Sequence, residues 1–200
     1  MNRLYALASV GFCVASAALI TSASALPSEE IPKTEPEYIA KVKTAAPAEV
    51  VSNATITMPQ PDGSSKTVQT GSNGFTCFIG KDGTPECDDQ NAMEWRKALQ
   101  ANQAPPNKIG FIFMLAGDTG TSNHDFAERH THQHWVQTGP HVMIVGGAVH
   151  ETLSPYPRDL DVKDPTQPYV MFPGKPSEHL MISVNSQEPA TTGSTNGHGG

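Results

Sequence analysis

The strongest constraint on the fold is a series of four short apolar runs in the second half of the chain. Each run has glycine, proline or serine close to its ends, a pattern typical of buried β-strands. The connections between the later runs are short, which favours antiparallel order. The four runs are residues 109–115 (IGFIFML), 141–145 (HVMIV), 169–172 (YVMF) and 179–184 (HLMISV).

One helix is expected to cover this sheet. Residues 91–102 carry Ala92, Trp95 and Leu99 on one helical face, and Arg96 falls on the opposite face. Asp89 is suited to cap the first turn. We therefore predict an α+β fold: a single domain with a largely antiparallel sheet of five or six strands, packed on one face by this main helix. A short N-terminal helix and a disulfide-tied loop complete it.

The first half of the chain predicts smaller elements. Residues 37–46 have apolar side chains at helical spacing, before Pro47. Residues 54–58 and 66–70 alternate in character and flank a Pro-Asp-Gly turn, which indicates a β-hairpin.

The chain begins with a pattern typical of a secretory signal peptide, residues 1–25. Arg3 precedes an apolar run, and Ala23-Ser24-Ala25 forms a small-residue cleavage site. The run is short for a retained membrane anchor, which needs roughly 20 apolar residues. We expect a flexible lead-in at 26–36, one globular domain at 37–185 and a disordered tail at 186–200. The expected location is periplasmic or secreted.

Cleavage leaves two cysteines, Cys77 and Cys87, which we expect to form a disulfide in an oxidising compartment. Closing so short a loop stabilises a fold by roughly 2–3 kcal/mol. The alternative, a metal–thiolate site, needs reduced sulfurs at closer spacing.

The chain is acidic, with a formal net charge of −7. Cleavage of the signal peptide makes the mature chain more acidic still, because Arg3 is the sole charged side chain of the signal peptide. This charge argues against nucleic-acid binding, and we expect no membrane insertion after cleavage.

Two of the apolar runs begin with a His-x-Met pattern. Alternation along a strand puts His141 with Met143 on one face, and His179 with Met181 on one face. If these strands are neighbours, two imidazoles and two thioethers converge, a set suited to Cu(I). We expect the main helix to pack on the opposite, aliphatic face. The structural alternative is that the methionines fill the core and the histidines are hydrogen-bonded.

The segment HDFAERHTHQHWVQTGPHVM, residues 124–143, is rich in histidine. His130, His132 and His134 alternate, so an extended loop would present them on one side, where they could hold Cu(II) or Zn(II). The alternative is a solvated loop that tolerates histidines.

Residues 115–123, LAGDTGTSN, resemble the aspartic-protease signature. That resemblance implies that Asp118 is catalytic and that a homodimer supplies a second aspartate. The sequence departs from the pattern, since it has one copy and Ala116-Gly117 before the aspartate. A plain turn explains the same residues, because aspartate caps turns and glycine adopts positive φ.

The succession of GSNGFTC, GFIFMLAGDTGTSN, HWVQTGPHVMIV, PYVMFPG and HLMISV resembles a family of exported, uncharacterised bacterial proteins. The similarity spans roughly residues 45–184, and it implies export but no activity. His141 and His179 lie inside the matching segments, whereas the histidines at 130–134 depart from the family's pattern.

These observations favour a non-enzymatic periplasmic protein that binds a transition metal, copper or zinc, or a small ligand on its His/Met face. The alternatives are an Asp118-dependent hydrolase and an envelope interaction protein without chemistry.

Overall fold

The structure is a computed structural model that describes residues 30–184. The predicted signal peptide (1–25) and tail (186–200) lie outside these residues. Within them, no helix is both long and apolar enough to cross a membrane.

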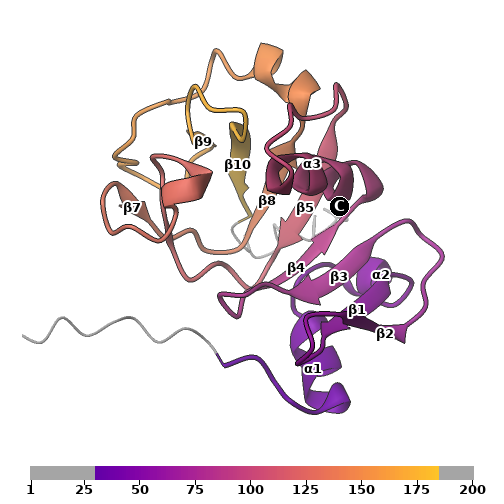
Figure 1. Cartoon of the computed structure of the whole chain (residues 1–200). Coiled ribbons are helices and arrows are strands. Elements are labelled where there is room, and N and C mark those ends of the chain that lie inside the picture. The colour runs from indigo at the N-terminus through magenta and orange to yellow at the C-terminus, as the bar shows by residue number, and fades with distance from the viewer. Residues whose placement is uncertain (1–29, 185–200) are drawn as a thin grey trace, which may run out of the picture.

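Eight strands of the described residues form one mixed sheet with the strand order β2-β1-β3-β4-β5-β8-β10-β9 (Figure 1). All neighbouring strands are antiparallel except β1 and β3, which are parallel. The strands are β1 (Thr55–Pro59), β2 (Ser65–Gln69), β3 (Thr76–Ile79), β4 (Pro85–Asp88), β5 (Gly110–Met114), β8 (His141–Val145), β9 (Tyr169–Met171) and β10 (His179–Ser183).

The remaining elements surround this sheet. Strands β6 (Thr121–Ser122) and β7 (Trp135–Val136) form a separate two-stranded sheet. The helices are α1 (Glu35–Val42), α2 (Ala48–Val51), α3 (Gln90–Gln100) and the 3-10 turns η1 (Phe126–Glu128) and η2 (Gly147–Thr152).

The predicted α+β fold class is confirmed, and all four apolar runs are strands. The sheet is larger than the expected five or six strands. The difference comes from β3 and β4, a hairpin that the sequence indicated only as a disulfide-tied loop. Cys77 lies directly opposite Cys87 in this hairpin and forms the predicted disulfide with it.

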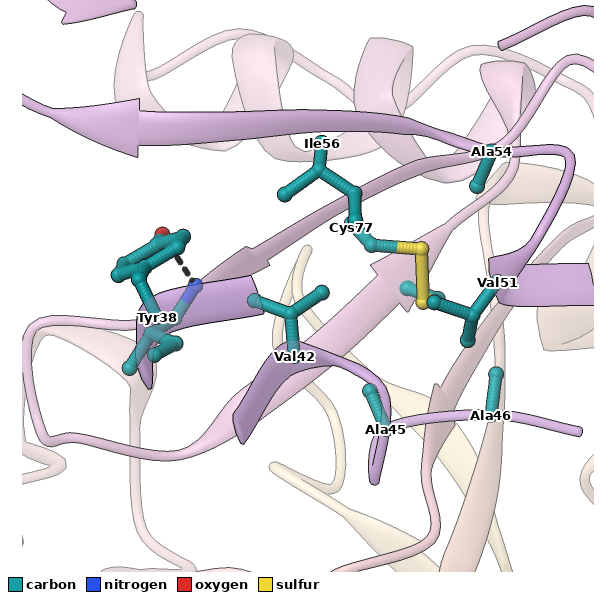
Figure 2. Packing of buried hydrophobic residues seen from close by; sticks show 10 residues of the cluster. Tyr38, Val42, Ala45, Ala46, Val51, Ala54, Ile56 and Cys77 are labelled. Atoms are coloured by element: carbon teal, nitrogen blue, oxygen red, sulfur yellow. Dashed lines mark hydrogen bonds between the residues drawn. A yellow bond between two sulfur atoms is a disulfide. The ribbon is translucent and has the colours of Figure 1, made fainter. Parts of the chain in front are cut away.

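We call the face of the sheet that carries Cys77 and Cys87 the first face. Around strands β1, β3 and β4 this face is covered by α1 and α2 (Figure 1). Tyr38 and Val42 of α1 pack against the disulfide and Ile56, as Figure 2 shows. The Tyr38 hydroxyl donates to Thr57 O (2.8 Å) and accepts the Ile79 backbone N–H (2.9 Å), so the buried hydroxyl is satisfied in both roles.

The aliphatic side chains of β8, β9 and β10 lie on the same first face. Ile144 and Leu180 lie opposite each other and pack against Val149 and Leu153, in and just after η2. The late strands therefore bury their aliphatic side under a 3-10 turn.

Helix α3 covers the second face, which carries the histidines and methionines. Asp89 caps it by accepting the Ala92 N–H (2.7 Å), as predicted. A side chain at Gly110 would meet the Ala92 backbone at 2.4 Å, so the glycine lets the helix cross β5 closely.

The prediction that this helix packs on the aliphatic face is wrong. Trp95 packs with Met143 and lies beside His179, both on the second face. Arg96, expected to point away from the sheet, contacts Glu86 and Asp88 on it. Helical periodicity defines which side of α3 is apolar but not which face of a two-sided sheet that side meets.

Candidate functional site

The second face carries a diagonal of histidines and methionines across β8 and β10. The two strands are neighbours, and Met143 lies opposite Met181. His141 lies opposite Ser183, four residues from His179, so roughly 14 Å along the strands separates the two backbone positions. The antiparallel order therefore puts the imidazoles at opposite ends of the methionine pair.

Both histidines line one cavity of about 120 Å³. Its thioether end consists of His179, its strand partner Met171 and its strand neighbour Met181, with the rings of Trp95 and Phe172. Its carboxylate end consists of Asp82, Asp118 and His141. The cavity is lined also by Glu86, Arg96, Met114, Gly120, Thr121, Arg129 and Met143.

His179 is held as a neutral imidazole at the thioether end. Its Nδ1 lies 2.8 Å from the Ser177 carbonyl oxygen, so Nδ1 carries the proton and donates it. Burial lowers the pKa of His179 to about 4, with smaller contributions from the neighbouring His141 and Arg96 side chains. Its Nε2 is buried and has no hydrogen-bond partner among the described residues. His179 lines the cavity, and no described residue uses the lone pair on its Nε2.

His141 repeats this arrangement at the carboxylate end. It is 0% exposed, and its Nδ1 lies 2.7 Å from the Gly139 carbonyl oxygen. Burial lowers its pKa, so this ring is also neutral near pH 7. Its Nε2 has no hydrogen-bond partner in the described part of the chain and lies 4.0 Å from Asp118 Oδ2.

Two aromatic rings wall the thioether end. The Trp95 ring lies edge-on to His179 with centroids 5.6 Å apart, and the Phe172 ring lies at 5.7 Å. Both side chains are buried, so they keep bulk water from the imidazole. The sequence indicated neither residue as part of a site, because each is typical of an ordinary core.

Asp118 is positioned by the Asp-Thr-Gly turn. Its Oδ1 accepts the backbone N–H of Gly120 (2.9 Å) and of Thr138 (3.0 Å). Burial raises the pKa of Asp118 to about 6, although these hydrogen bonds lower it. The aspartate-capped turn, which the sequence indicated as the alternative to a protease motif, is therefore present. It also places the Asp118 carboxylate in the lining of the cavity.

A buried ionic cluster borders the cavity and was not predicted. The Arg96 guanidinium donates to Glu86 (2.9 Å) and Asp88 (3.0 Å), and it lies 5.4 Å from the centre of the Phe78 ring. Burial raises the pKa of Glu86 to about 7, against the opposing effect of Arg96. The sequence signal was weak: two carboxylates just before a helix with an arginine in its second turn.

The histidine loop does not form the predicted cluster. The His132 ring lies against Trp135 at 4.6 Å, and His134 Nδ1 lies 2.8 Å from Asp161. His130 is exposed. Within residues 30–184, no three or more His, Cys, Asp or Glu side chains are grouped so that they could hold a metal.

No protein-family model, curated protein or solved structure matches this chain. The resemblance to exported bacterial proteins is therefore still a prediction, as is export itself.

Proposed function

We propose that the protein binds a soft transition-metal ion, Cu(I), at the thioether end of the cavity. The ligands are His179 Nε2 and the thioether sulfurs of Met171 and Met181. The observation that carries this proposal is the buried Nε2 of His179, which has no partner among the described residues, on a side chain that lines the cavity together with Met171 and Met181.

The second contact of His179 supports a ligand role. Metal-bound histidines typically donate their other ring N–H to a carbonyl or carboxylate, which fixes the ring and the tautomer. Here Nδ1 donates to Ser177 O, and the low pKa keeps Nε2 free of a proton. The ring is thus prepared to bind a metal without first losing a proton.

The neighbouring methionines favour Cu(I) over zinc. Met171 lies directly opposite His179, and Met181 follows it on the same face of β10. Thioethers are soft ligands that select Cu(I), whereas imidazole alone suits zinc as well as copper.

The cavity size favours an ion over an organic ligand. Sites for drug-sized molecules have volumes of about 300–1,000 Å³, and this cavity has about 120 Å³. A small protic molecule hydrogen-bonded to His179 Nε2 is the alternative ligand. The predicted signal peptide and the disulfide fit a copper-binding role in the periplasm or outside the cell.

An anaerobic Cu(I) titration of tag-free mature protein, with a competing chromophoric chelator, tests the proposal. We expect one Cu(I) per chain at this end, with at least tenfold weaker binding in His179→Gln. Met171→Leu and Met181→Leu conserve volume, so they should keep the fold and still weaken binding. The exposed His130→Gln is the matched control. Equal affinity of wild type and His179→Gln would contradict the proposal.

A second candidate, an Asp118-dependent hydrolase, is favoured by one observation. Asp118 has a pKa raised to about 6 and lies 4.0 Å from His141 Nε2, a separation that one water molecule can bridge in an acid–base pair. The test is acid-optimal peptide cleavage that is lost in Asp118→Asn. Cleavage by wild type and variant at equal rates would exclude it.

A further inference from the structure

We infer that the carboxylate end of the cavity is a second cation site, in which Asp118 Oδ2 and His141 Nε2 ligate a divalent ion of borderline hardness, Zn(II). This site is separate from the copper position and does not depend on it. The evidence for this site is the short distance between Asp118 Oδ2 and the buried His141 Nε2.

The Asp118 carboxylate is fixed by hydrogen bonds from the Gly120 backbone and from the backbone and hydroxyl of Thr138. Both backbone donors, Gly120 N–H and Thr138 N–H, bind Oδ1. The Asp118 N–H in turn donates to Thr138 O (3.0 Å). Hydrogen bonds in both directions thus join the Asp118 turn to Thr138, which follows β7. The other carboxylate oxygen, Oδ2, is the one nearest to His141 Nε2.

The separation of the two atoms fits an ion and not a direct hydrogen bond. A hydrogen bond between them requires about 2.7–3.2 Å, and the distance is 4.0 Å. Zinc binds nitrogen at about 2.0–2.1 Å and carboxylate oxygen at about 2.0–2.2 Å, so one ion spans up to roughly 4.3 Å in a straight line and roughly 3.4 Å at a tetrahedral angle. Binding with tetrahedral geometry therefore requires the two atoms to approach each other by roughly 0.6 Å.

His141 is the independent observation that points to a ligand. Its side chain is fully buried, Nδ1 is committed to Gly139 O, and Nε2 has no hydrogen-bond partner among residues 30–184. A buried imidazole lone pair without a partner is costly unless something else occupies it.

The surroundings of this end favour a hydrated cation. Asp82 adds a second carboxylate close enough to raise the pKa of Asp118. Asp118 is 12% exposed at its side chain, and Gly120 and Thr121 beside it are half-buried. The same cavity is also lined by two opposing charges, Arg129 and Arg96, of which Arg96 is paired with Glu86 and Asp88. Since the protein supplies two ligands here, water completes the coordination.

Zinc titration of the full tag-free protein by calorimetry tests the inference. We expect one Zn(II) per chain, with at least tenfold weaker binding in Asp118→Asn and in His141→Gln. Asparagine keeps an oxygen for the Gly120 and Thr138 N–H groups, so the turn should fold. The exposed Asp159→Asn is the matched control. X-ray absorption of the zinc complex should show nitrogen and oxygen neighbours without sulfur.

The two proposals fail separately. His179→Gln should leave zinc binding unchanged, and Asp118→Asn should leave Cu(I) binding unchanged. Wild-type zinc affinity in a folded Asp118→Asn protein would overturn the second site, and so would sulfur neighbours around zinc. Loss of Cu(I) binding alone would bear only on the copper proposal.

Discussion

Met143 and Met181 lie directly opposite each other on β8 and β10, and they separate the two cavity histidines. Because opposite residues of an antiparallel pair face the same side of a sheet, this pair is the floor between a thioether end and a carboxylate end. One cavity thus offers two donor sets of different hardness.

Removing Arg96 should strongly destabilise the protein. Arg96→Met leaves Glu86 and Asp88 buried without their counter-charge, and breaking a buried ion pair in this way costs about 3–5 kcal/mol. Urea unfolding at pH 7.5 measures the loss. Lys97→Met, at an exposed position of the same helix, should change the free energy of unfolding by less than about 0.5 kcal/mol. Equal effects of both variants would refute the role of the cluster.

Acid should destabilise the wild type through His179. Its pKa is about 4 when folded and 6.5 in the unfolded reference, so unfolding takes up a proton between these values. The contribution of His179 to the free energy of unfolding is therefore fully present above pH 6.5. It falls by about 3 kcal/mol at most as the pH drops toward 4.

The difference between wild type and His179→Gln isolates this effect. Glu86 and Asp118 act in the opposite direction, because their raised pKa values make unfolding release protons between pH 4 and 7. Urea unfolding from pH 4.5 to 7.5 should show a shallower acid loss in His179→Gln than in wild type. His130→Gln should follow the wild type. Parallel curves for wild type and His179→Gln would contradict the assignment.

Gly120 should not tolerate alanine. Its φ is +92°, and an added Cβ would lie 2.5 Å from the Trp135 ring. Gly120→Ala therefore combines backbone strain of about 1–2 kcal/mol with displacement of that ring. Gly74→Ala is the matched control, because Gly74 has φ +81° and open space around its Cβ position. Thermal unfolding should show the larger loss at Gly120, and equal losses would exclude the steric effect.

Removing the disulfide should weaken the N-terminal half without changing the cavity. Cys77→Ala with Cys87→Ala should cost roughly 2–3 kcal/mol, measured by urea unfolding. Both cysteines lie on the first face, under α1, whereas the cavity lies on the second face. Cu(I) affinity should be retained in the folded double variant. A tenfold loss of affinity would show that the two faces are coupled.

Local pattern in the sequence was enough for much of the fold. The apolar runs became β5, β8, β9 and β10, Asp89 caps α3, and Cys77 pairs with Cys87. Strand alternation also put His141 with Met143, and His179 with Met181, on one side. These features depend on backbone periodicity and short-range hydrogen bonding, which neighbouring residues determine.

The tertiary structure alone decided how these pieces meet. Antiparallel pairing of β8 with β10 separates His141 from His179, and α3 covers their face instead of the aliphatic one. The same packing brings Asp118 to His141, and Arg96 to Glu86. Register and the choice of covered face depend on contacts between residues far apart in the chain. Because apolar side chains pack on both faces of this sheet, alternation along a single strand could not distinguish them.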